Sequence, residues 1–198
     1  LREAVNVSYN KISVDGDTST NDTVLILANG LAENATISEK NADYENFVEA
    51  LKYVTITIAK KLAKDGEGAT KLIECTVNGA KTEEEGTIFA KSVITSSLVK
   101  TAMFGADANW GRILCALGYA GLDFEPEKVD VYFESKGGNI IVCKNGASVE
   151  FDEDIAKKIL IEDEITIKID MGLGDVTVTA WGCDLTYEYV KINGDYRS

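Results

Sequence analysis

The feature that most constrains this chain is a dense polar block, Val14–Thr23, between two apolar stretches. Within ten residues it carries three carboxylates, one amide and four hydroxyl groups. Ile12 precedes it and the apolar run Val24–Ala28 follows it, which predicts a buried element on either side. Because an unpaired buried polar group costs roughly 1–3 kcal/mol, the side chains of the block need partners among themselves, in the backbone or in a ligand. The rest of the chain is therefore expected to form a scaffold around this block.

The overall composition predicts a packed globular protein and argues against two classes of partner. The chain has 198 residues, of which 45% are hydrophobic, enough for one sizeable domain or two small ones. Its net charge of −13 argues against a nucleic-acid partner, because a surface that binds nucleic acid needs basic residues. No apolar run reaches the roughly 18 residues that a membrane-spanning helix needs, so no membrane partner is expected.

Histidine is absent from the chain, and this limits the chemistry available to it. Nucleophiles activated by a serine–histidine or cysteine–histidine pair are removed, which leaves carboxylate, hydroxyl, lysine or a terminal amine. The four cysteines, Cys75, Cys115, Cys143 and Cys183, show no Cys-x-x-Cys spacing, so no metal site is expected. Scattered cysteines of this kind are typical of buried thiols in a cytosolic protein, which predicts a cytoplasmic location.

The first residues already have helical spacing, at Leu1, Val5 and Tyr9, and no capping residue precedes them. The sequence is therefore predicted to begin inside a helix, with a further segment upstream of Leu1.

The hydrophobic periodicity predicts a mixed α+β fold. The clearest helix is 43–64, where one apolar stripe recurs at helical spacing: Phe47, Leu51, Val54, Ile58 and Leu62. Further helices are predicted at 82–98, 109–117 and 152–160, of which the first two begin at capping residues. Alternating or apolar stretches predict strands at 71–77, 129–133, 140–143, 165–169, 176–180 and 187–193.

The lone proline, Pro126, lies where the pattern of the sequence changes. We therefore predict two domains, 1–123 and 124–198, of which the second is a small sheet with one helix. The tail is dense in aromatic and polar residues up to Ser198, whereas chain ends are usually frayed. This composition predicts an anchored and buried terminus.

The spacing Asp15-x-Asp17-x-Ser19 is compatible with three kinds of loop. A calcium loop needs glycine at its sixth position and glutamate at its twelfth, where this chain has Thr20 and Ile26. An aspartyl-phosphate nucleophile of the haloacid-dehalogenase type needs threonine or valine where Ser19 stands. A hydrogen-bonded turn, in which these side chains cap backbone amides, needs neither and is favoured by spacing alone.

Two other segments could be either structural or functional. Glu67 stands between two glycines in Asp65–Lys71, a segment that lacks the Walker pattern. It is compatible with an ordinary turn between helix and strand, or with a carboxylate that binds an ammonium group. Arg112, just after the predicted cap Asn109, could meet a carboxylate or form a structural ion pair.

Four segments, taken in order, carry a more specific signal than any of them alone. They are Asp15–Thr23, Asp65–Lys71, Asp107–Arg112, and Trp181–Tyr187 with Lys191–Asn193. In this order they resemble the β chain of the ornithine acetyltransferase family (glutamate N-acetyltransferase), and the resemblance runs from the first residue to the last. It implies the layered sheet-and-helix core of that family with a smaller C-terminal domain.

The resemblance also implies an activity. A precursor cleaves itself before a threonine, and this threonine becomes the N-terminal nucleophile of the β chain. It takes acetyl from N-acetylornithine and passes it to glutamate in arginine biosynthesis; some members also use acetyl-CoA as co-substrate, and no other cofactor is implied. The α and β chains assemble as an α2β2 heterotetramer in the cytoplasm. Such a nucleophile agrees with the absence of histidine, because the amine of the threonine itself can act as the base.

Carried over residue by residue, the resemblance implies three substrate-binding positions: Glu67, Asn193 and Ser198. Glu67 would hold an ammonium group of the substrate, and Ser198 stands where family members often end in threonine. The block Asp15–Thr23 would support the nucleophile, and Arg112 is not implied as a site residue.

The resemblance places the catalytic threonine upstream of Leu1. This chain alone is therefore expected to be inactive and to supply no catalytic residue. Glu67 and the tail are expected to line half of a pocket that faces the start of the chain, where the attacking hydroxyl would enter.

Two other interpretations stay open on the residues. The chain could belong to an N-terminal-nucleophile aminopeptidase of related fold, which would release a free acid and need no glutamate. It could also be a binding subunit that holds a ligand without forming any acyl intermediate.

Overall fold

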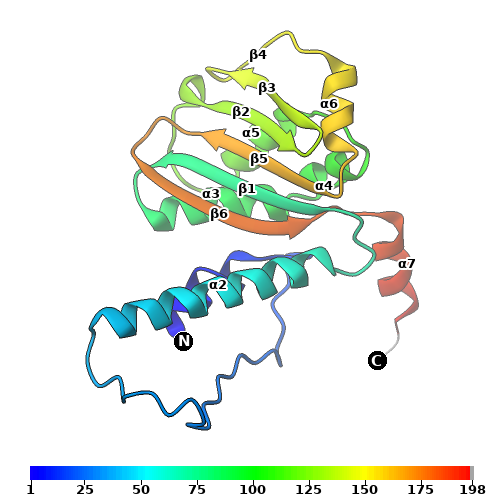
Figure 1. Ribbon diagram of the computed structural model, residues 1–198. Coiled ribbons are helices and arrows are strands. Elements are labelled where there is room, and N and C mark those ends of the chain that lie inside the picture. The colour runs from blue at the N-terminus through cyan, green and yellow to red at the C-terminus, as the bar shows by residue number, and fades with distance from the viewer. Residues whose placement is uncertain (197–198) are drawn as a thin grey trace.

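The computed structural model of the protein describes residues 1–196, and its centre is a six-stranded mixed sheet (Figure 1). The strands are β1 (Leu72–Ala80), β2 (Asp130–Ser135), β3 (Gly138–Lys144), β4 (Ala147–Ser148), β5 (Glu164–Asp170) and β6 (Val176–Cys183). Their order across the sheet is β4-β3-β2-β5-β1-β6. Only β1 and β5 run parallel within this sheet, and the other neighbouring pairs are antiparallel.

Most helices of the described residues begin at a side chain that caps them. The helices are α1 (Arg2–Asn6), α2 (Ala42–Lys64), α3 (Glu83–Thr95), α4 (Ser97–Phe104), α5 (Trp110–Gly118), α6 (Glu153–Leu160) and α7 (Tyr187–Asp195), with short 3-10 turns at Tyr9–Lys11 and Pro126–Lys128. The side chains of Thr82 and Asn109 accept backbone N–H groups of α3 and α5, which confirms both predicted caps. The predicted helix 82–98 is interrupted because Ser96 caps a new helix, α4. None of the helices within residues 1–196 could span a membrane.

The start of the chain is helical, but only for a short stretch. Leu1 precedes α1, and its side chain makes no capping hydrogen bond. Helix α1 ends at Asn6, and Tyr9 begins a separate 3-10 turn. Of the three residues with predicted helical spacing, Leu1 precedes α1, Val5 lies in it and Tyr9 begins the 3-10 turn.

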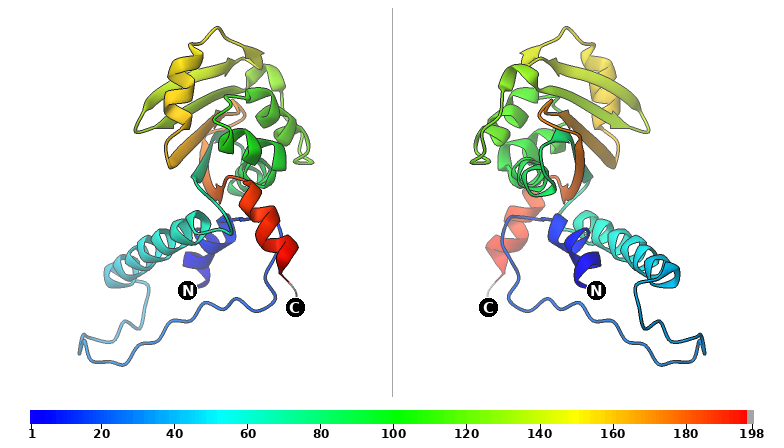
Figure 2. Two further views of the ribbon diagram at one scale, coloured as in Figure 1. Left: turned by 90° about the vertical axis from the view of Figure 1, so that its right-hand side faces the viewer. Right: turned by 90° about the vertical axis from the view of Figure 1, so that its left-hand side faces the viewer.

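One face of the sheet forms the core. A row of buried side chains in register crosses four strands on this face: Phe133, Ile167, Cys75 and Ala180. Helices α3, α4 and α5 lie on one side of the sheet (Figure 2), and α3 contacts both β1 and β6. The neighbouring row points to the other face and is only partly buried: Tyr132, Lys168, Thr76 and Thr179. The mixed α+β class predicted from the sequence is therefore confirmed, with one face of the sheet covered by helices.

The predicted domain boundary crosses this sheet. Strand β1 precedes residue 123, yet it lies between β5 and β6, which both follow that residue. The division into 1–123 and 124–198 stays a prediction, but it does not separate two sheets.

The apolar run Val24–Ala28 is predicted to be buried, and this prediction is wrong. The run forms neither helix nor strand, and Leu25 and Leu27 are 78% and 92% exposed. Residues 17–41 leave the body of the molecule as a long loop and return at the start of α2 (Figures 1 and 2). An apolar run indicates burial against some surface, and no surface of residues 1–196 packs on it.

Helix α2 has nearly the predicted bounds, but its apolar stripe does not pack against the rest of the described chain. The residues that α2 buries are Val48, Thr55, Ala59 and Ala63, which form a mostly small-residue face toward α1 and β6. The stripe predicted from periodicity is largely exposed, with Phe47 at 51%, Val54 at 49%, Ile58 at 42% and Leu62 at 50%.

The tail also differs from its prediction. The pattern of residues 187–193 predicts a strand with buried side chains, but these residues belong to α7, and α7 buries none of its residues. Thr186 accepts the N–H of Glu188 and so starts a helix. The chain leaves the sheet where β6 ends, so residues 187–193 gain no neighbouring strand with which to pair.

Candidate functional site

Four segments that are distant in sequence meet at one end of the sheet, where β1 begins and β6 ends. They are residues 13–17, the loop 65–71 between α2 and β1, Lys100 on α4, and residues 183–193. In Figure 1, α7 leaves the sheet at this end and descends beside the end of α2.

Two predicted substrate-binding residues are in direct contact there. The side-chain amide of Asn193 donates to Glu67 Oε2 at 2.6 Å, across 126 residues of sequence, and to the carbonyl of Tyr189 at 3.1 Å. Both side chains are exposed. Glu67 takes part in none of the ion pairs found among residues 1–196, so its charge is not neutralised by a lysine or arginine of that part of the chain. The third predicted position, Ser198, lies outside the described residues.

Leu1, the residue before which the nucleophile is predicted, belongs to a different part of the fold. Its side chain is aliphatic and 46% exposed, and α1, which follows it, packs on α2. Within residues 1–196, no hydrogen bond or ion pair joins Leu1 to Glu67, Asn193 or the segments around them. Leu1 itself therefore offers no catalytic group, and the threonine upstream of it stays a prediction.

The two glycines beside Glu67 allow the loop to approach its neighbours closely. Gly68 has a φ of +67°, and a Cβ there would lie 2.7 Å from the backbone nitrogen of Tyr189 in α7. A Cβ on Gly66 would lie 2.9 Å from both Cys183 Sγ and a methyl group of Val14. Any larger residue at either position would push the loop away from α7 or from β6.

Two buried polar residues after β6 hold this loop in place. Asp184, which is 3% exposed, accepts from the backbone N–H groups of Thr70 and Lys71 at 2.8 and 2.9 Å and from the Thr70 hydroxyl. The Thr186 hydroxyl donates to the carbonyl of Gly68 at 2.6 Å and accepts from Glu188 N–H at 3.2 Å. Sequence reasoning missed both roles, because the loop residues that they hold lie more than 110 positions away.

Two buried lysines brace the same end of the sheet. Lys71 Nζ donates to the carbonyls of Met103 and Leu160 at 2.6 and 2.7 Å. Burial lowers the pKa of Lys71, and the nearby charge of Asp184 opposes that shift. Lys100 Nζ donates to the carbonyls of Val14 and Cys183 at 2.5 and 2.6 Å, which ties residues 13–16 to the end of β6. No sequence pattern predicted these contacts of either lysine, although Lys71 ends the segment Asp65–Lys71.

The polar block divides into an anchored start and an exposed remainder. Tyr189 of α7 donates its hydroxyl to Asp15 Oδ2 at 2.9 Å, and burial, followed by this bond, raises the pKa of Tyr189 to about 12. Residues 17–23 are exposed, and Ser19 accepts the N–H groups of Asn21 and Asp22. The hydrogen-bonded turn is therefore present, but it does not lie between two buried elements.

Arg112 lies outside this cluster, on α5. It donates to the carbonyl of Leu98 at 2.9 Å and to the hydroxyl of Thr101 at 3.3 Å. It therefore braces α4, and it pairs with no carboxylate among residues 1–196.

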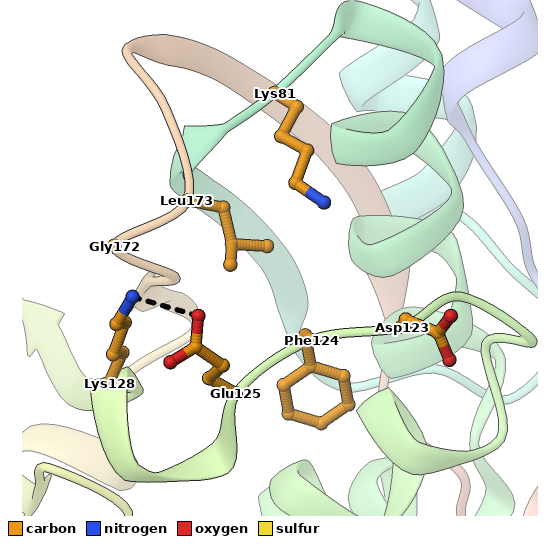
Figure 3. A pocket seen from close by; sticks show the side chains of 7 residues that line it. All are labelled: Lys81, Asp123, Phe124, Glu125, Lys128, Gly172 and Leu173. Atoms are coloured by element: carbon orange, nitrogen blue, oxygen red, sulfur yellow. Dashed lines mark hydrogen bonds and ion pairs between the residues drawn. The ribbon is translucent and has the colours of Figure 1, made fainter.

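Two shallow hollows lie elsewhere on the surface. One of about 280 Å³ opens at the opposite end of the sheet (Figure 3), and its lining is Lys81, Asp123, Phe124, Glu125, Lys128, Gly172 and Leu173. The other, of about 380 Å³, lies on the exposed side of α2 near its C-terminal end. Neither includes Leu1, Glu67 or Asn193, and both members of the Glu67–Asn193 pair are exposed on the surface of this chain. The half pocket that these residues are expected to line stays a prediction. Within residues 1–196, no three His, Cys, Asp or Glu residues are grouped to hold a metal ion.

Comparison with known proteins identifies the family. The model of the ArgJ family matches residues 1–198, the whole chain. This chain belongs to the ArgJ family. The resemblance to the ornithine acetyltransferase family, drawn from the four sequence segments, is thereby confirmed.

Members of this family are similar to the chain over its whole length in sequence, and over nearly all of it in structure. The chain is 55% identical to the arginine biosynthesis bifunctional protein ArgJ of Caldanaerobacter subterraneus and 56% identical to ArgJ 1 of Clostridium acetobutylicum, in each case over all 198 residues. It spans about half the length of these curated ArgJ relatives, 49% and 48%. A crystal structure of ArgJ from Bacillus halodurans has a TM-score of 0.92 and 46% identity, over 98% of this chain and 90% of that one.

Proposed function

We propose that this chain is the β half of a glutamate N-acetyltransferase that moves acetyl from N-acetylornithine to glutamate. The observation that carries the proposal is the contact of Glu67 with Asn193 in a member of the ArgJ family. An exposed carboxylate without a cationic partner among residues 1–196 suits the ammonium group that both amino-acid substrates carry. The relatives' name, arginine biosynthesis bifunctional protein, agrees with this reaction.

The chemistry proceeds through an acetyl-threonine on a segment upstream of Leu1. The threonine hydroxyl attacks the acetyl carbonyl of N-acetylornithine, and its proton passes through the terminal amine to the departing amine of ornithine. The α-ammonium of glutamate loses one proton to solvent and attacks the acetyl carbonyl as a neutral amine. The C–O bond to threonine then breaks, a second amine proton passes through the terminal amine to the threonine oxygen, and N-acetylglutamate is released. Glu67 holds the amino-acid substrate by its charge, and Asn193 fixes the direction of that carboxylate. Donors for the oxyanion come from the other half of the protein.

The proposed partner is the α half of the same precursor, in an α2β2 assembly located in the cytoplasm. Support comes from length: the chain covers about half of the curated ArgJ sequences but 90% of one crystallised ArgJ chain, as expected for a processed half. Support also comes from the apolar residues that this chain leaves exposed in residues 24–31 and along α2. Large apolar side chains that are exposed in such numbers usually mark an interface. Acetyl-CoA is proposed as a second acetyl donor because the relatives are named bifunctional.

The test is an assay of the complete two-half protein with N-acetylornithine and glutamate. Glu67→Gln keeps the size of the side chain and removes its charge, so the KM for each amino-acid substrate should rise roughly 10- to 100-fold, as expected for a lost hydrogen bond to a charged group. Glu188→Gln is the matched control, because Glu188 is exposed on α7 and its carboxylate pairs with Lys191.

Four outcomes would count against parts of the proposal. Failure of the intact complex to form ornithine and N-acetylglutamate removes the acetyl transfer itself. Release of free acid from amides or peptides without any need for glutamate favours the aminopeptidase. Substrate binding with no acetyl-protein in the mass spectrum favours a non-catalytic subunit. An unchanged KM in Glu67→Gln would remove Glu67 from the site.

A further inference from the structure

The segment that joins β6 to α7 grips the Glu67 loop at two points. We propose that Thr186 and Asp184 are positioning residues that hold Glu67 against Asn193 and so set the affinity for the amino-acid substrate. This inference rests on the proposed function only for the role of Glu67. The hydrogen bonds of Thr186 and Asp184 to residues 68–71 are contacts among described residues and do not depend on that role.

Thr186 connects the two members of the pair through one hydroxyl group. Its Oγ1 donates to the carbonyl of Gly68, the residue directly after Glu67, at 2.6 Å. The same oxygen accepts from Glu188 N–H and caps α7, which carries Asn193 two turns further along. The loop and the helix are therefore fixed to each other at a residue that is only 6% exposed.

Asp184 fixes the other end of the loop to the sheet. Its carboxylate accepts two backbone N–H groups and one hydroxyl, from Thr70 and Lys71, just before β1 begins. Charge-assisted hydrogen bonds of this kind are stronger than neutral ones, and burial strengthens them further. Glu67 is thus held between the last turn of α2 and two anchored residues.

The glycine beside Glu67 completes the arrangement. Because Gly68 has no side chain, its backbone packs directly on the first turn of α7, close to Glu188 and Tyr189. The position of Glu67 relative to α7 is therefore set by backbone contact and by the Thr186 hydroxyl. Loss of that hydroxyl would let the loop and α7 move apart without removing either substrate-binding side chain.

A positioning role predicts an effect on substrate affinity rather than on the amount of folded enzyme. Holding a binding group in place before the substrate arrives lowers the free-energy cost of binding. A purely structural residue would lower thermal stability and the fraction of active sites, and the KM of the remaining active enzyme would not change. Separate measurement of KM and of kcat per active site distinguishes the two roles.

The experiment compares Thr186→Val with Thr186→Ser in the complete two-half protein. Valine keeps the shape and removes the hydroxyl, whereas serine keeps the hydroxyl. We expect Thr186→Val to raise the KM for N-acetylornithine and for glutamate roughly tenfold, with kcat per titrated site changed less than about threefold. Thr186→Ser should return KM to within about threefold of the unmodified protein.

A double variant shows whether Thr186 acts through Glu67. In the Glu67→Gln background, Thr186→Val should add little to the KM, because the group that Thr186 positions has already lost its charge. Additive effects of the two changes would overturn the inference. An increase in KM for Glu67→Gln without one for Thr186→Val would also overturn it.

Two further measurements keep the inference separate from the proposed function and from misfolding. If Glu67→Gln leaves KM unchanged, the proposed role of Glu67 fails, and amide hydrogen exchange then tests whether Thr186 holds the loop. Residues 66–71 should exchange faster in Thr186→Val than in Thr186→Ser. Equal exchange in the two variants would overturn the inference. If Thr186→Val does not fold, Thr70→Val removes one partner of Asp184 at an exposed residue. This variant should raise KM about fivefold, and an unchanged KM overturns the inference.

Discussion

The same apolar residue types are buried in the body of the sheet but exposed in residues 24–31 and along α2. In the body, Leu117 on α5 and Ile167 on β5 are completely buried. In residues 24–31 and along α2, Leu27 is 92% exposed and Val54 is 49% exposed. In the body, the apolar side chains of the sheet and those of the helices pack against each other. In residues 24–31 and along α2, the described chain supplies exposed apolar side chains but no second surface that covers them. A hydrophobic pattern thus indicates that a residue is buried by something, and the fold of the single chain decides whether the partner is present.

The largest test of this comparison is a matched pair of leucine truncations. Leu117→Ala should lower the free energy of unfolding by about 2–5 kcal/mol, because it leaves a cavity in a closed core. Leu27→Ala should change it by less than about 0.5 kcal/mol in this chain alone, because the side chain already lies in solvent. Denaturant unfolding of each variant measures both values. A loss above about 2 kcal/mol for Leu27→Ala would show that residues 24–31 pack within the chain after all.

The next test asks whether the exposed stripe of α2 faces a partner. Ile58→Lys places a charge on a side chain that is 42% exposed, and it should weaken association with the α half at least tenfold, about 1.4 kcal/mol. The free energy of unfolding of the isolated chain should change by less than about 0.5 kcal/mol. Titration of one purified half into the other, followed by calorimetry, measures the association.

Its neighbour Ala59 gives the control on the same helix. Ala59 is completely buried, so Ala59→Lys should destabilise this chain itself. Unchanged association for Ile58→Lys, together with a destabilised Ala59→Lys, would mean that the stripe is an exposed surface without a partner.

The parts of the fold that the sequence predicts well are those that depend on residues close by in the sequence. Thr82 and Asn109 cap their helices through residues three positions away, and the alternation of Ile165, Ile167 and Ile169 needs only one buried face. The prediction for Val24–Ala28 is wrong because its packing surface is absent from the described chain. The prediction for the tail is wrong because the spacing of its aromatic residues resembles a strand, while the cap at Thr186 starts a helix.

The candidate site divides in a similar way. Glu67 and Asn193 are reached through resemblance to a family, and they lie in contact. Asp184, Thr186 and Lys100 hold backbone atoms 80 or more residues away, and no local pattern predicts these contacts, although Thr186 also caps α7. Such contacts exist only once the sheet has brought the end of β6 beside the start of β1.

The smallest expected effect concerns the polar link that holds α7, a helix with no buried residue. The pKa of Tyr189, which is partly buried, is raised to about 12, first by this partial loss of solvent and then by its bond to Asp15. Since an unperturbed tyrosine titrates near 10, the folded state keeps a proton that the unfolded state releases. The stabilisation from this group is therefore complete below about pH 10 and is lost as the pH rises toward 12.

Phenolate absorbance of the protein, minus that of Tyr189→Phe, should isolate one titration near pH 12. Asp15→Asn should lower that midpoint only in part, because burial is the larger cause and remains in the variant. Tyr53→Phe, on the exposed side of α2, should leave the step near pH 12 in place. A difference titration centred near pH 10 would mean that α7 is not held against Asp15. Helix α7 would then resemble residues 24–31 and the exposed stripe of α2, which have no packing partner within the described chain.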